Sequence, residues 1–101
     1  MANEGYNSEL VEAEGYYTKM ILSKKKEIAK YEIFNPELLV DINGLDSMYT
    51  DLENDLKVYQ KDDRLINAMI RNLQQSVDIL NKQLNILEQL KMIEEDEKIS
   101  I

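Results

Sequence analysis

Four acidic residues with roughly the spacing of a calcium-binding loop are the first candidates for chemistry in this sequence. Asp51, Glu53 and Asp55 alternate along the chain, and Asp62 follows them. A calcium loop of the helix–loop–helix type needs glycine at its sixth position and a bidentate glutamate at its twelfth. Those positions hold Leu56 and Asp62 here. We therefore expect no metal site, and we assign these carboxylates to a solvated helix surface.

Other catalytic groups are scarce. The chain has no cysteine and no histidine, which excludes disulfides, thiol catalysis, cysteine-ligated zinc and every mechanism that needs an imidazole base. The sequence contains no glycine-rich phosphate loop and no nucleophile–base motif, and none of its carboxylates follows an apolar, pocket-forming loop. We expect a protein that is not an enzyme, with no catalytic, cofactor-binding or metal-binding residues and no cofactor.

The charge and hydropathy patterns limit the class of partner. A net charge of −8 argues against nucleic acid and against anionic lipid headgroups, because binding to either needs a basic face. No apolar run approaches the roughly 18–20 residues of a membrane helix. Residues 1–5 have neither the basic nor the apolar region of a signal peptide. We expect the chain as written to be soluble, although it could also be an excised part of a membrane protein.

The elements that carry these residues are predicted to be helices. The chain has three glycines and one proline, so it has little material for tight turns. We expect a first helix over 8–31, capped by Asn7 or Ser8. Gly15 either weakens this helix by about 1 kcal/mol or permits close approach of a neighbour. The apolar stripe of this helix consists of Leu10, Ala13, Tyr17, Met20 or Ile21, Ile28 and Tyr31.

A second helix is predicted over 36–59. Asn35 is a favourable N-cap and Pro36 a favourable first helical residue, and Phe34 stands where a hydrophobic staple would pack. Apolar residues then recur with alternating spacings of four and three, which is the seam of a coiled coil. These residues are Leu38, Ile42, Leu45, Tyr49, Leu52, Leu56 and Tyr59.

A third helix is predicted over 63–95, with Asp62 or Asp63 as its cap. It carries two adjacent apolar rows, and two rows need two partner helices. The first row is Ile66, Ile70, Leu73, Val77, Leu80, Leu84 and Leu87. The second row is Met69, Ile79, Ile86, Leu90 and Ile93.

These patterns predict an all-α fold in which three amphipathic helices form an antiparallel helical bundle or coiled-coil hairpin. We expect one domain over 1–101, because the chain is short. The short connection near residue 61 makes the last two helices antiparallel neighbours. The side chains expected to be buried between these two helices are Leu45, Tyr49, Leu52, Ile70, Leu73, Val77 and Leu80.

The far end of the third helix is the predicted interface. That helix is longer than the other two, so its end is expected to project and to leave an exposed apolar patch. We predict that Leu84, Leu87, Leu90 and Ile93 pair with a second subunit in a dimer, with the acidic end at the rim. The alternative is a monomeric bundle in which the first helix covers this end. Tyr16 is a second candidate contact, or it covers the flank of the bundle.

Three amides lie near the apolar faces of the third helix. Asn67, Asn72 and Gln83 are either solvated at the boundary or buried, where an asparagine sets register and oligomeric state.

The order of these features resembles a family of Bacteroidota single-span membrane proteins labelled anti-sigma factor or anti-sigma-like, in the part that follows the membrane span. The residues that carry the resemblance are Glu12 to Thr18, Phe34 to Leu39, Leu45-Asp46, Tyr49, Leu52, Arg64 to Asn72, Ile79-Leu80 and Leu87 to Leu90. The resemblance covers roughly 8–92 and includes no catalytic motif. It implies a periplasmic location behind a membrane helix and a cytoplasmic segment, neither of which this sequence contains.

Two functional hypotheses follow. In the first, the chain is the periplasmic interaction or sensing domain of a membrane-anchored, anti-sigma-like regulator, and contact with a sigma factor belongs to another part of that protein. In the second, it is a free-standing soluble coiled-coil adaptor, secretion chaperone or assembly protein, which would place it in the cytoplasm. Both hypotheses require protein partners, and a full reading frame with an upstream apolar span of about 20 residues would favour the first.

Overall fold

The computed structural model describes residues 8–33 and 35–100, with side chains up to residue 97. It contains three helices, α1 (Ser8–Ala29), α2 (Pro36–Val58) and α3 (Asp63–Ser100), and no strand in this part of the chain. The molecule is elongated, with principal extents of 62 × 22 × 19 Å. The predicted all-α bundle of three helices is confirmed.

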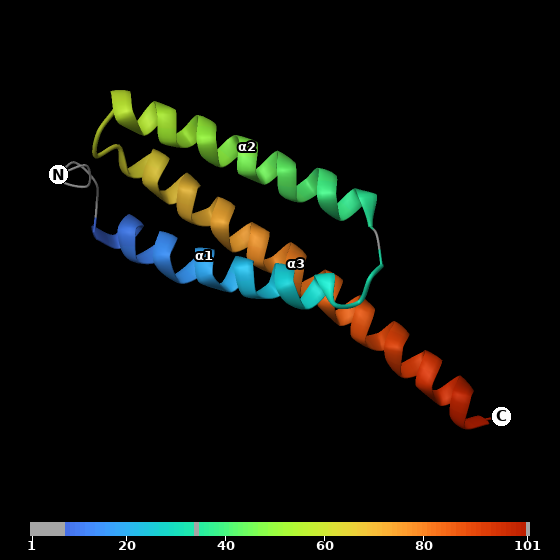
Figure 1. Ribbon diagram of the computed structural model, residues 1–101. Helices are drawn as coiled ribbons and strands as arrows, with labels where there is room; N and C mark the ends of the chain where they lie inside the picture. The colour runs from blue at the N-terminus through green and yellow to red at the C-terminus, as the bar shows by residue number, and fades with distance from the viewer. Residues whose placement is uncertain (1–7, 34, 101) are drawn as a thin grey trace.

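The long helix α3 is the central element. Both α1 and α2 pack along it, whereas no Cα atom of α1 comes within 8 Å of a Cα atom of α2. The helix α2 runs antiparallel to both of the others, and α3 continues beyond them toward the C-terminus (Figure 1). The projection of α3 follows from its length, since its 38 residues compare with 22 and 23 in the other helices.

Local hydrogen bonds explain where the helices start. Asn35 has extended backbone angles, and its Oδ1 accepts hydrogen bonds from the backbone N–H groups of Glu37 (3.1 Å) and Leu38 (3.3 Å). Pro36 follows as the first helical residue, as predicted. Asp62 caps α3 by accepting from the N–H of Arg64 at 2.9 Å. The predicted cap Asn7 and the predicted staple Phe34 lie outside the described residues.

The ends of the helices differ from the predicted ones by one to five residues. The last turn before the α1–α2 connection tightens, because Tyr31 N–H donates to the Ile28 carbonyl, and Glu32 then takes a left-handed φ of 55°. Lys61 in the α2–α3 connection has a φ of 66°. At the other end, α3 runs on to Ser100 through the acidic residues rather than ending near residue 95.

The core lies along α3. At the end near the α2–α3 connection, Leu10 of α1, Leu56 of α2, and Ile66 and Met69 of α3 form one buried cluster that joins all three helices. Further along, Leu45, Leu73, Val77 and Leu80 are buried as predicted, whereas Tyr49, Leu52 and Ile70 are only partly buried. Space around Gly15 is open, so the close approach considered for it does not occur.

Candidate protein-interaction surface

The helix α2 packs against α3 only as far as Gln83. The side chain of Asn35, the residue that caps α2, donates from Nδ2 to Oε1 of Gln83 at 2.9 Å. Gln83 is buried beneath this contact. Because Asn35 precedes α2, no residue of that helix packs on α3 beyond this level. The hydrogen bond therefore marks the level at which the packing of α2 against α3 ends.

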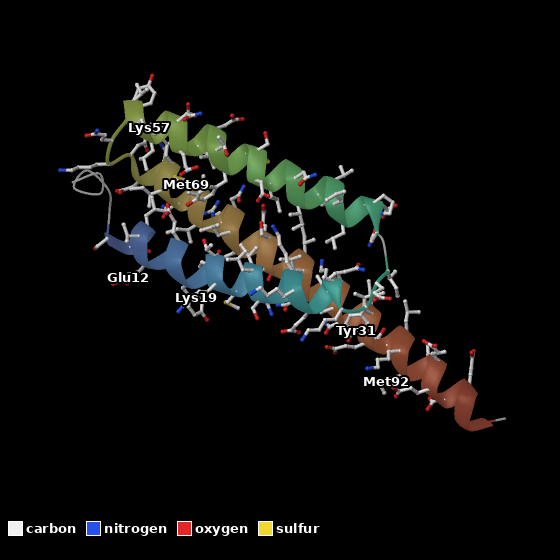
Figure 2. All side chains as sticks on the ribbon, viewed as in Figure 1. Glu12, Lys19, Tyr31, Lys57, Met69 and Met92 are labelled. Carbon is white, nitrogen blue, oxygen red and sulfur yellow. The ribbon has the colours of Figure 1, made fainter. Side chains whose placement is uncertain are left out.

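The helix α1 packs against α3 for about one turn beyond Gln83, toward the C-terminus. The end of α1 and the following turn supply Glu27, Lys30, Tyr31 and Ile33 to a groove whose other side is α3. From α3 the groove is lined by Leu87, Leu90, Lys91 and Glu94, and its volume is about 690 Å³. Tyr31 marks the place where α1 stops along α3, and Met92 lies on the projecting part (Figure 2). We call this site the end groove.

A smaller groove of about 320 Å³ adjoins the end groove. Its lining comes from all three helices and includes Lys25, Ile28, Leu38, Ile42 and Leu80. Ile33 lines both grooves. The smaller groove, which is lined by α1, α2 and α3, thus meets the end groove at Ile33.

The four leucine and isoleucine residues predicted at the interface fall into two groups. Leu84 is 6% exposed and Leu87 is 1% exposed, so the prediction that they form an exposed patch is wrong. The reason is that α1 runs parallel to α3 and reaches the level of Leu87, which places both side chains in the intrachain core. Leu90 and Ile93 lie past that point and are 48% and 55% exposed. Ile86 and Met92 are exposed beside them.

Tyr16, the other predicted contact, lies apart from the end groove. It is 62% exposed on α1, and its ring meets the ring of Tyr17 edge-on with centroids 5.1 Å apart. Tyr17 faces α3, where its hydroxyl accepts a hydrogen bond from Nε2 of Gln74 at 3.0 Å. Tyr16 therefore shields the flank of Tyr17, and the structure does not bring it together with Leu90 and Ile93.

The polar side chains of the core contribute to register. Nδ2 of the buried Asn72 donates to the Leu45 carbonyl of α2 at 2.9 Å, and the Ser76 hydroxyl donates to the Asn72 carbonyl at 3.2 Å. The Tyr49 hydroxyl donates to Oε1 of Glu14 at 2.7 Å and so links α2 to α1. Of the three predicted amides, Asn72 and Gln83 are buried, and Asn67 is exposed. These hydrogen bonds fix the positions of the three helices relative to one another, and these helices form the grooves.

Ile33 is the contributor to the grooves that sequence reasoning missed. It follows the predicted first helix and precedes Phe34 and Asn35, so the sequence pattern places it in the connection. An apolar residue just after a helix and before a cap signals that the turn packs against a neighbour. In the structure Ile33 remains exposed at the shared wall of the two grooves.

Other kinds of site find little support in the part of the chain that the structure describes. No three acidic side chains gather there as metal ligands, which applies to Asp51, Glu53 and Asp55 as well. None of the described helices has a segment that is both long and apolar enough to cross a membrane.

Comparisons with known proteins identify no relative of this chain. No protein-family model, no curated protein and no solved structure matches the chain.

Proposed function

We propose that this chain is a non-enzymatic helical domain that binds another protein through the projecting end of α3 and the end groove beside it. One observation carries the proposal. Leu90, Met92 and Ile93 lie on a regular helix after Leu87, the last residue of α3 that is buried, and all three are exposed, as is Ile86 one turn earlier. Neighbouring exposed apolar side chains of this kind are typical of surfaces that another protein covers.

The charge of the chain supports a protein as the partner. The net charge is −8, and acidic residues dominate the end of α3. Nucleic acid and anionic lipid would be repelled by such an end. An amphipathic helix of another protein would bury the apolar row and leave the acids at the solvated rim.

The resemblance described above gives this domain a biological setting. We place it on the periplasmic side of a membrane-anchored, anti-sigma-like regulator, as a sensing or assembly module joined to a span outside this chain. The alternative is a free-standing adaptor, chaperone or assembly protein in the cytoplasm. Fractionation of the native protein separates the two, since the first requires it in the inner-membrane fraction and the second in the soluble fraction.

Site-specific photo-crosslinking in the native host tests the interaction surface directly. A photoreactive amino acid replaces Leu90 in one variant and Glu53, an exposed residue on α2, in the other. We expect a discrete protein adduct from position 90 and none from position 53. Equal adducts at both positions, or no adduct at position 90, would refute the proposed surface.

A further inference from the structure

Opposite charges are separated along the molecule near the end groove. The last part of α1 and the turn that follows it are lysine-rich, and the end of α3 is acidic. The lysines are Lys24, Lys25, Lys26 and Lys30, and the acids are Glu94, Glu95, Asp96 and Glu97. Within the described part of the chain, none of these four lysines forms an ion pair. The acids also stand at the C-terminal end of their helix, where the helix dipole disfavours negative charge.

The two charged segments of one chain lie at different levels along α3. Lys30 lines the end groove opposite Leu87 and Leu90. Glu95 comes eight residues after Leu87, which places it about 12 Å further along the axis at 1.5 Å per residue. The acids beyond Glu94 therefore lie on the projecting part, past the end of α1 (Figure 1).

We propose that the protein bound at the end groove is a second copy of this chain, whose α3 end packs antiparallel to the first. This inference rests on the proposed function and names its partner. A two-fold axis near Lys91 brings residue 95 of one copy level with residue 87 of the other. The acidic end of each copy then reaches the level of Lys30 in its partner, and the pairing occurs twice by symmetry.

The same arrangement places the acidic residues of one copy and Lys30 of the other copy on the same side of the paired α3 helices. Glu88 and Glu95 share the heptad position of Gln74, and the Gln74 side chain contacts Tyr17 of α1. These acids therefore lie on the α1 side of α3. A two-fold axis perpendicular to an antiparallel helix pair keeps both α1 helices on one side of that pair. Glu95 of each copy consequently faces Lys30 of the other, while Leu90 lies close to the axis and becomes covered.

A charge-exchange experiment tests this pairing with the whole chain. One variant carries Lys30→Glu, and a second carries Glu94→Lys, Glu95→Lys and Glu97→Lys. Sedimentation should show the unchanged chain at twice its 11.8 kDa mass. Each variant alone should self-associate at least about tenfold more weakly, since opposing charges become like charges. An equimolar mixture of the two should restore a one-to-one dimer, because both sets of contacts are again complementary.

Controls distinguish a wrong assignment of the partner from a wrong assignment of the interaction surface. Lys57→Glu on α2 changes the same charge far from the groove and should leave the dimer unchanged. A helical circular dichroism spectrum for each variant shows that it is folded. A chain that stays at 11.8 kDa, or a mixture that fails to reassociate, overturns the second-copy assignment. If crosslinking at position 90 then captures a different protein, the proposed interaction surface is correct but its partner is that other protein. If crosslinking captures no protein, the proposed function is wrong as well.

Discussion

At the scale of single residues, Asn72 is the buried group whose chemistry is most constrained. Its Nδ2 donates to the Leu45 carbonyl, so a side chain of the same size that cannot donate leaves two acceptors facing each other. We expect Asn72→Asp to lower the free energy of unfolding by about 1–3 kcal/mol at neutral pH. The loss should shrink in acid, where a protonated carboxyl donates again. Urea unfolding at two pH values measures both effects.

Substitution of Asn72 by leucine provides the contrast. It removes the donor without burying a charge, and the Leu45 carbonyl keeps its hydrogen bond within α2, so no acceptor is left without a partner. Asn72→Leu should therefore retain most of the stability while weakening the register between α2 and α3. An equal loss of stability in the Asp and Leu variants would show that packing, rather than the hydrogen bond, is what matters at this position.

Gly15 provides a prediction of the opposite sign. It lies inside α1, no neighbouring side chain or helix comes within 4 Å of the place that a β-carbon would occupy, and its φ is not positive. Alanine at an open helical position loses less backbone entropy than glycine on folding. Gly15→Ala should raise the free energy of unfolding by about 1 kcal/mol. Thermal unfolding at one fixed protein concentration measures the change, and Gly44→Ala on α2, which is equally open, should behave in the same way.

At the scale of the helices, the boundary between core and surface on α3 lies between Leu87, which is buried, and Leu90, which is exposed one turn later. Leu87 is buried under α1, so Leu87→Glu places a charge without a partner in the core and should cost about 4 kcal/mol or more. Leu90→Glu should change the stability of the isolated chain by less than about 1 kcal/mol, because the side chain is half exposed. Denaturant unfolding below the concentration of self-association tests both. Similar losses from the two changes would contradict the level at which α1 ends.

The heptad spacing of α2 and α3 and the Asn35-Pro36 start were enough to predict the helices and the bundle. Those signals are local, and the structure preserves them. The depth of Leu84 and Leu87 could not be predicted in this way, because it depends on how far α1 slides along α3. That offset is set by contacts between distant residues, such as Leu10 with Ile66 and Met69, which no spacing within one helix encodes. The exposure of Leu90 and Ile93 could be predicted, because both lie beyond any plausible offset.

At the scale of the molecule, the shape is that of a short bundle with a long helical extension. The core is concentrated along the part of α3 that both other helices cover, up to Leu87. The extension beyond it runs past the ends of both other helices (Figure 1) and depends on its own helix propensity. An isolated helical end of this length frays readily in water. A partner that covers the extension would therefore both bury its apolar side chains and reduce its fraying.

Hydrogen–deuterium exchange at two protein concentrations tests this central claim most directly. Amides of residues 90–97 should exchange quickly in dilute solution, near 1 µM, and markedly more slowly near 1 mM, where a second copy occupies the end groove. Amides around Leu73, within the bundle, should be equally protected at both concentrations. Unchanged exchange over 90–97, or new protection confined to the α1 surface around Tyr16, would contradict the account.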